Sequence, residues 1–222
     1  WAVKIDANGN KIWDKRFGSS VNDELYAAAA SSDGGYILAG RSGGPANGDK
    51  SEASRGNFDY WAVKVDANGS KLWDKRFGGS SNDYCYDVVA TADGGCLLAG
   101  YSNHLSGNTG DRTEASRGND DYWVVRVDSN GNKLWDKSFG GTGHDRCRAA
   151  VATPDGGFLL AGISASNAGG DKREGSRGFF DYWAVRIDAD GNKVWDKTFG
   201  GDQLDDCYAV AVTADGGFLL AG

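Results

Sequence analysis

Short stretches in which apolar and polar residues alternate run along the whole chain and predict β-strands. Residues 61–66, Trp-Ala-Val-Lys-Val-Asp, alternate with a period of two, which is typical of a strand. The Asn-Gly pair that follows tolerates the positive φ angles of a tight turn, so residues 71–77 should return as a second strand. Residues 86–91 and 96–101 predict two further strands around an Asp-Gly-Gly turn. No stretch has a helical period, and the sequence therefore predicts an all-β protein.

This four-strand pattern is repeated. The 8 tryptophans fall into pairs, and the first tryptophans of successive pairs, at positions 1, 61, 123 and 183, recur about every 60 residues. The blocks WAVKVDANGSKLWDKRFG and TADGGCLLAG both have counterparts in every repeat. Repeats of four short antiparallel strands are typical of β-propeller blades. We therefore predict one β-propeller domain with four blades of four antiparallel strands.

The order of strands within a blade follows from side-chain size. The Ala-rich run at 27–30 and its counterparts suit the innermost position, because the axis of a small ring is crowded. The Leu-Leu-Ala-Gly strand then lies second, the Trp-x-Val strand third and the Trp-Asp-Lys strand outermost.

The predicted blades cover approximately 22–79, 82–141 and 144–201, with the fourth made of 205–222 plus 1–18. The N- and C-terminal strands would then share one blade and close the ring, which removes free sheet edges. The alternatives are that the repeats are a piece of a larger array, or that copies assemble into a larger ring.

A polar loop, GDKSEASRGNFDYW at 48–61, has relatives at 110–123 and 170–183. The fourth copy would fall where the chain ends meet. Binding sites commonly lie on loops held by a rigid scaffold, and arginine with carboxylates can hold sugar hydroxyls through paired hydrogen bonds. The candidate ligand-binding residues on these loops and on the short acidic loops between blades are Asp23, Asp49, Glu52, Ser54, Arg55, Asp83, Asp111, Glu114, Ser116, Arg117, Asp145, Asp171, Glu174, Ser176, Arg177 and Asp205.

A structural interpretation of the same loops stays open. Arginine and aspartate at fixed repeat positions also form ion pairs that would hold a long loop against the neighbouring blade. Asp59, Asp121 and Asp181 end the long loops and would take part in either role.

Charge and cysteine content narrow the function classes. A net charge of −7 argues against a nucleic-acid partner, which needs clustered Lys and Arg. No apolar run approaches the ~20 residues that span a bilayer, so membrane insertion is not expected. Cys85, Cys96, Cys147 and Cys207 lack a Cys-x-x-Cys spacing and are expected to be free, partly buried thiols.

No catalytic residues are assigned. His104 and His144 occupy different repeat positions and are expected on surface loops, without a Ser-His-Asp constellation. No cofactor is expected, and calcium is the one metal that the oxygen-rich loops would suit. The segment Asp188-Ala-Asp-Gly-Asn has its glycine too early for a calcium loop and is interpreted as a hairpin turn.

The repeat pattern D-Y-W-x-V-[KR]-[VI]-D-x-[ND]-G-N-K-x-W-D-K-x-F-G-G, followed by D-G-G-x-L-L-A-G, resembles repeats of secreted or surface proteins from Bacteroidetes-like bacteria. It is more distantly similar to seven-bladed-propeller and NHL-type repeats. The resemblance implies a propeller fold and a secreted or cell-surface location, and it supplies no activity.

We therefore expect a non-enzymatic, lectin-like binding protein whose partner is a glycan or a protein surface, with carbohydrate as the first ligand class. The alternatives are a structural or protein-interaction scaffold and, third, a glycoside hydrolase or lyase.

Overall fold

The computed structural model describes residues 1–103 and 109–222. The described chain is all-β, as expected, and its strands form antiparallel sheets. Three sheets have four strands each, in the orders β3-β4-β5-β6, β7-β8-β9-β10 and β11-β12-β13-β14. No helix long and apolar enough to cross a membrane occurs among the described residues.

The three complete sheets are simple meanders in which strands adjacent in the chain pair with each other. The first contains β3 (Asp23–Ala30), β4 (Tyr36–Gly43), β5 (Phe58–Val65) and β6 (Lys71–Phe77). The second contains β7 (Asn82–Ala90), β8 (Cys96–Asn103), β9 (Asp120–Val127) and β10 (Lys133–Phe139). The third contains β11 (Asp145–Ala152), β12 (Phe158–Ser164), β13 (Asp181–Ile187) and β14 (Lys193–Phe199).

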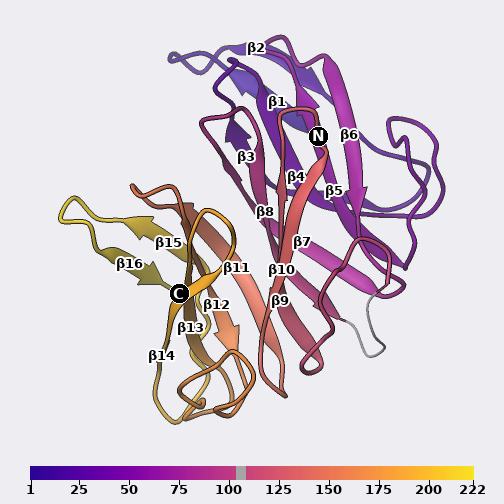
Figure 1. The fold of residues 1–222 in the computed structure, drawn as a ribbon. Coiled ribbons are helices and arrows are strands. Elements are labelled where there is room, and N and C mark those ends of the chain that lie inside the picture. The colour runs from indigo at the N-terminus through magenta and orange to yellow at the C-terminus, as the bar shows by residue number, and fades with distance from the viewer. Residues whose placement is uncertain (104–108) are drawn as a thin grey trace.

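The remaining strands form two separate hairpins at the ends of the chain. β1 (Ala2–Ile5) pairs with β2 (Lys11–Lys15), and β15 (Ala209–Val212) pairs with β16 (Phe218–Ala221). The three sheets follow one another along an arc, with one hairpin at each end (Figure 1). The expected closing blade is not formed in this structure, because β16 does not pair with β1.

The strand order within each sheet agrees with the order expected from side-chain size. The Ala-containing strands β3, β7, β11 and β15 contact one another in succession, so they occupy the inside of the arc (Figure 1). The Trp-Asp-Lys strands lie at the outer edge of each complete sheet.

The hairpin turns differ in one detail from the expectation. Asp66 accepts a hydrogen bond from the backbone N–H of Gly69, and its carboxylate accepts two more from the backbone N–H groups of Asn68 and Ser70. Within this turn only Gly69 has a positive φ, at 79°. No non-glycine residue among those described has a positive φ. The aspartate therefore holds the turn through its side chain, and the asparagine does not need the left-handed conformation.

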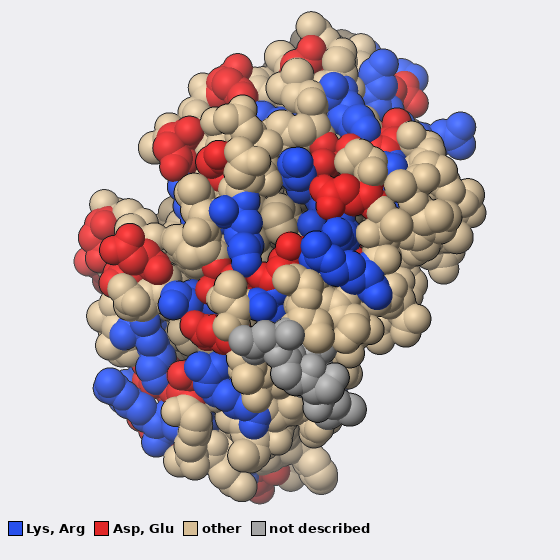
Figure 2. Space-filling model, turned by 45° about the vertical axis from the view of Figure 1, so that its right-hand side comes forward, with Lys and Arg blue, Asp and Glu red and all other residues tan. Residues whose placement is uncertain are grey.

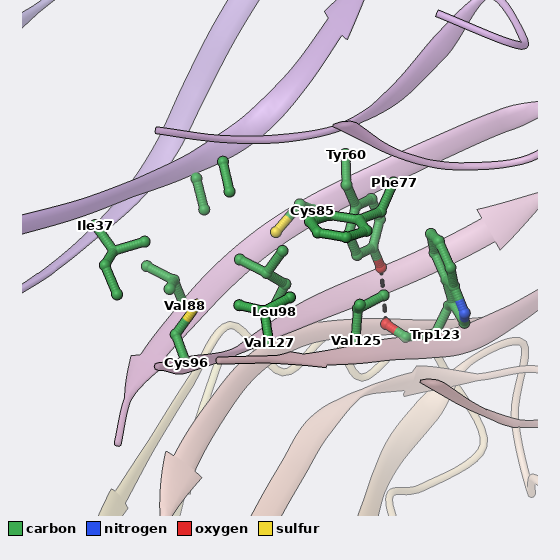
Figure 3. Packing of buried hydrophobic residues seen from close by; sticks show 12 residues of the cluster. Ile37, Tyr60, Phe77, Cys85, Val88, Cys96, Leu98, Trp123, Val125 and Val127 are labelled. Carbon is green, nitrogen blue, oxygen red and sulfur yellow. Dashed lines mark hydrogen bonds between the residues drawn. The ribbon is translucent and has the colours of Figure 1, made fainter. Parts of the chain in front are cut away.

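The core lies between successive sheets. Trp61, Trp123 and Trp183 are fully buried, and apolar residues of neighbouring sheets interdigitate around them. The hydroxyl of Tyr60 donates to the carbonyl of Trp123 in the next sheet at 2.7 Å, a bond drawn in Figure 3. The hydroxyl of Tyr122 donates to the carbonyl of Trp183 at 2.8 Å. These buried bonds fix each sheet against the next.

The four cysteines are free and buried, which confirms the expectation. Cys85 and Cys96 lie in the apolar cluster of Figure 3, and Cys147 lies in the next one. Burial raises the pKa of the Cys96 thiol to about 12. The thiols therefore pack as small apolar side chains.

Candidate functional site

Each long polar loop is tied to the outer strand of its own sheet. Asp74 of the Trp-Asp-Lys motif accepts hydrogen bonds from the backbone N–H of Ser51 at 2.8 Å and from the indole of Trp61 at 3.2 Å. It also forms an ion pair with Lys71 at 2.9 Å. Asp136 and Asp196 repeat the arrangement in the other two sheets. The motif aspartate thus organises the loop, a role that the sequence did not reveal.

A buried lysine or arginine side chain fixes each long loop through hydrogen bonds. Lys50 is 2% exposed and donates to the carbonyl of Gly43 at 2.9 Å and to the hydroxyl of Ser54 at 2.6 Å. Lys172 occupies the same repeat position and binds Ser166 and Ser176 in the same way. Burial lowers the pKa of both lysines.

Arg112 is the counterpart of these lysines in the middle loop. Its guanidinium donates to the hydroxyls of Ser102 at 2.9 Å and Ser138 at 3.1 Å. Each of the three buried cations lies near two aspartates, one at or next to the start of an inner strand and one at or next to the start of a third strand. For Arg112 these are Asp83 and Asp121.

The inner-strand aspartates are largely enclosed by the protein. Asp83 is 1% exposed and accepts from the backbone N–H of Gly79 at 2.8 Å. Burial raises its pKa to about 7, an effect that its hydrogen bonds and Arg112 only partly offset. Asp145 is fully buried, accepts from Gly141 N–H and Ser166 Oγ, and has its pKa raised by burial. The structure thus does not present these two carboxylates on the surface.

Ion pairs link each long loop to the next one. Arg55 pairs with Asp111, and Arg117 pairs with Asp171 at 2.7 Å. Both aspartates also accept a backbone N–H from the segment that joins two sheets. Arg177 is the third in the series, and its guanidinium donates to the carbonyl of Gly200 at 3.2 Å.

The other candidate residues have partners within the chain as well. Glu52 pairs with Arg76, Glu114 with Lys137, and Glu174 with Lys197. The hydroxyls of Ser54 and Ser176 accept hydrogen bonds from the buried lysines, and the hydroxyl of Ser116 donates one to Asp121. Asp23, Asp49 and Asp205 accept backbone N–H groups of Ser19, Gly18 and Gly201.

These contacts agree with the charge distribution on the surface. Figure 2 shows Lys and Arg interleaved with Asp and Glu across the face in view. Opposite charges that neutralise one another in this way brace the loops, and the structural interpretation of the loops accounts for every candidate residue.

A second group of polar side chains was not expected from the sequence. Tyr26, Tyr86, Arg148 and Tyr208 occupy equivalent positions on, or just before, the four inner strands and form one continuous stack, here named the inner row. The rings of Tyr26 and Tyr86 stack with centroids 5.1 Å apart. The Arg148 guanidinium lies 4.8 Å from the Tyr86 ring centre and 5.9 Å from that of Tyr208. Tyr26 and Tyr208 are 43% and 62% exposed.

Two carboxylate–arginine pairs flank the inner row. Arg41 binds Glu24 at 2.8 Å and lies over the rings of Phe58 and Tyr84. In the next sheet junction Arg146 binds Asp120 at 2.6 Å and lies over the ring of Tyr101.

The histidines contribute to this region in one case. His144 is partly exposed and its Nδ1 lies 2.8 Å from Asp120, so it joins the second carboxylate–arginine pair. His104 lies outside the described residues.

One signal in the sequence could have identified the inner row. Most bracing residues are copied from repeat to repeat, although the buried cation reads Lys50, Arg112 and Lys172. The inner-row position reads tyrosine in three repeats and arginine in one. The position two residues earlier reads Glu24, Tyr84, Arg146 and Asp206. Variation of this kind between otherwise similar repeats is typical of a binding surface, because residues that only stabilise the fold do not need to vary.

Among the described residues, no group of three or more His, Cys, Asp or Glu side chains is arranged to hold a metal ion. Asp188 accepts the backbone N–H groups of Asp190 and Asn192, and this confirms that the segment is a hairpin turn.

No family model matches the chain. The chain is similar to regulatory protein FlaEY of Caulobacter vibrioides, with 24% identity over 236 residues, which cover 99% of this chain and 25% of that protein. Among solved structures it is similar to a protein of unknown function from Bacteroides caccae, with 13% identity, a TM-score of 0.47, and coverage of 96% of this chain and 58% of the other. A mutant of an apocarotenoid oxygenase from Synechocystis has 14% identity, a TM-score of 0.44, and coverage of 88% and 44%. The chain spans a quarter of the first protein and roughly half of each solved one. Likenesses at this level assign no activity to it.

Proposed function

We propose that this chain is a non-enzymatic binding module of β-propeller type, in which the inner row contacts the ligand. The end hairpins are, in this proposal, the two halves of a further blade. The observation that supports it is that the inner-row position and the position two residues earlier change between repeats whose bracing residues are mostly the same. Carbohydrate remains the first ligand class, because the exposed rings of Tyr26 and Tyr208 offer an apolar stacking surface beside the guanidinium group of Arg148, which can donate hydrogen bonds to sugar hydroxyls.

The polar loops take a different part in this proposal from the one the sequence suggested. Their arginines and acids already bind one another, so a ligand would have to displace intramolecular ion pairs to reach them. The inner row offers groups with free surface, above all Tyr208. We therefore assign the loops to bracing and the inner row to recognition.

A glycan array on the intact chain, followed by titration of the best oligosaccharide, tests the proposal. Tyr208→Ala and Arg148→Ala should weaken binding by about tenfold or more, as expected for exposed Tyr and Arg anchors, at an unchanged melting temperature. Phe179→Ala, which removes a 76% exposed ring from a polar loop, is the matched control and should leave affinity unchanged. Equal losses in all three variants, or a loss only in Phe179→Ala, would move the site away from the inner row.

A scaffold without a small-molecule site is the second candidate, and a specific observation favours it. Each loop is fixed by a buried cation and by an ion pair to its neighbour, which is what a rigid platform requires. If no oligosaccharide binds, the same Tyr and Arg residues are suited to a protein partner. Secretion or cell-surface display stays a prediction from the repeat resemblance.

A further inference from the structure

A β-bulge recurs at the inner-row position of the three complete sheets. Between β11 and β12 the pairing register shifts between Cys147 and Ala149, so Arg148 has no partner on β12. The registers of β3 with β4 and of β7 with β8 shift at the same repeat position and leave out Tyr26 and Tyr86. A bulge interrupts the regular pairing and redirects the extra side chain. The three bulges therefore place these side chains in one stack.

Within this stack, the guanidinium group of Arg148 has an aromatic neighbour on each side. Tyr86 lies on β7 and Tyr208 just before β15, and these are the two inner strands that contact β11. No ion pair or hydrogen bond of this guanidinium group is found in the described chain, and its Nε atom is buried without an acceptor. Arg148 is thus a cation held between two rings without an anionic partner.

Two further arginines beside the inner row are neutralised. Arg41 binds Glu24 at 2.8 Å, and Arg146 binds Asp120 at 2.6 Å. Both guanidinium groups also lie over aromatic rings, as that of Arg148 does. The three arginines therefore have similar aromatic surroundings, and the positive charge of Arg148 is the one that remains available to an anion from solution.

The surroundings of Arg148 favour a carboxylate as that anion. A guanidinium group binds a planar carboxylate through two parallel hydrogen bonds, and rings that exclude water from its faces strengthen the attraction. Asp87 accepts the backbone N–H of Ala150 at 2.8 Å, two residues from Arg148. Asp206 interacts with the hydroxyl of Tyr208. These acids and the net charge of −7 disfavour a dianionic phosphate more than a singly charged carboxylate.

We infer that Arg148 binds the carboxylate of an acidic sugar within the ligand of the inner row. This inference rests on the proposed carbohydrate-binding function and narrows it to oligosaccharides that contain a uronic acid. A saccharide that lies along the row would bring its carboxylate to the guanidinium group. The apolar faces of its sugar rings would then contact the exposed rings of Tyr26 and Tyr208.

Calorimetric titration with one oligosaccharide in two charge states tests the inference. The probes are a tetramer of galacturonic acid and the same tetramer with methyl-esterified carboxylates. The intact chain should bind the acid form about tenfold or more tightly than the ester, as expected for a charge-assisted pair. Added salt should reduce this difference. Arg148→Gln should abolish it, and Arg148→Lys should restore only part of it, because lysine keeps the charge and loses the planar fork.

Arg177→Gln is the matched control. Arg177 lies on a polar loop outside the inner row, and no carboxylate partner for it is found in the described chain. The substitution changes the net charge by the same amount as Arg148→Gln, so a preference for the acid form should persist. Arg148→Gln breaks no ion pair within the described chain, and its melting temperature should therefore stay close to that of the unaltered chain.

The other outcomes separate this inference from the proposed function. Equal binding of both tetramers, weakened by Tyr208→Ala, would contradict the inference and leave the inner row as a site for neutral carbohydrate. Neutral glycans as the only ligands on the array would have the same meaning. A preference for the acid form that survives Arg148→Gln would place the recognition of charge elsewhere. Binding of no glycan at all would contradict the proposed carbohydrate-binding function itself.

Discussion

At the scale of single residues, Asp83 shows how burial changes a group that the sequence presents as a surface acid. Its carboxylate lies between two sheets, near Arg112 and Asp59, and accepts only part of the hydrogen bonding that an ionised group needs. Burial raises its pKa to about 7. Between the unfolded value of about 3.9 and this value, the folded protein holds a proton that the unfolded chain has released.

The sign of the pH dependence follows from that proton. Stability should fall as pH rises from about 4 to about 7 and then level off, because the folded state binds more protons across this window. Burial also raises the pKa of Asp121 and Asp145, which adds in the same direction. We expect urea denaturation to give an unfolding free energy on the order of 2 kcal/mol lower at about pH 8 than at about pH 5, since each pKa unit corresponds to about 1.4 kcal/mol.

Asp83→Asn isolates the contribution of this one residue. The amide keeps an acceptor for Gly79 N–H and does not titrate, so the difference between the two pH values should shrink. An unchanged pH dependence in the variant would mean that Asp83 ionises normally in the folded protein.

At the scale of strands and sheets, the Tyr–Trp hydrogen bond is the contact that repeats from one junction to the next. Tyr122→Phe leaves the buried carbonyl of Trp183 without its donor, which should lower stability by about 1–3 kcal/mol. Tyr36→Phe is the matched control, because no hydrogen bond of the Tyr36 hydroxyl is found in the described chain and its ring keeps the contact with Trp13. Urea denaturation midpoints of the two variants compare these costs directly, and equal midpoints would contradict a fixing role for Tyr122.

Much of this level could be predicted from the sequence. The period of two in residues 61–66 and the Asp-Gly-Gly turns gave the strands, and small side chains identified β3 and its counterparts as inner strands. The glycine of each Asn-Gly turn was correctly expected to need a positive φ, but the asparagine was not needed in that role.

The candidate site was harder to predict, for a physical reason. Arg55, Asp111 and the other loop residues have the side chains of a sugar site, and only their distances show that they bind one another across 56 positions of sequence. The inner row depends on contacts between strands of different sheets, such as Tyr26 with Tyr86, which no local pattern records.

At the scale of the whole molecule, the linked loops and buried junctions should make the sheets unfold together. In a repeat array, stability depends on the interfaces between neighbours as well as on each repeat. The end hairpins have an interface on one side only, so they should be the least stable part of the isolated chain. The sequence could not reveal this, because whether β16 reaches β1 depends on the angle between sheets and not on the pattern within them.

The loop ion pairs provide the test at this scale. Arg117 binds Asp171 and the carbonyl of Ser138, and so joins two sheets, whereas no carboxylate partner of Arg177 is found in the described chain. Since Arg117 is about a third exposed, Arg117→Ala should lower the unfolding free energy by about 1 kcal/mol, at the upper end for partly solvated pairs. Arg177→Ala should change it by less than about 0.5 kcal/mol, the usual range for surface substitutions. Thermal denaturation of both variants, with titration of any oligosaccharide found on the array, separates bracing from recognition. A lower melting temperature with unchanged affinity in Arg117→Ala is the expected result. Lost affinity with an unchanged melting temperature would show that the loops belong to the binding site.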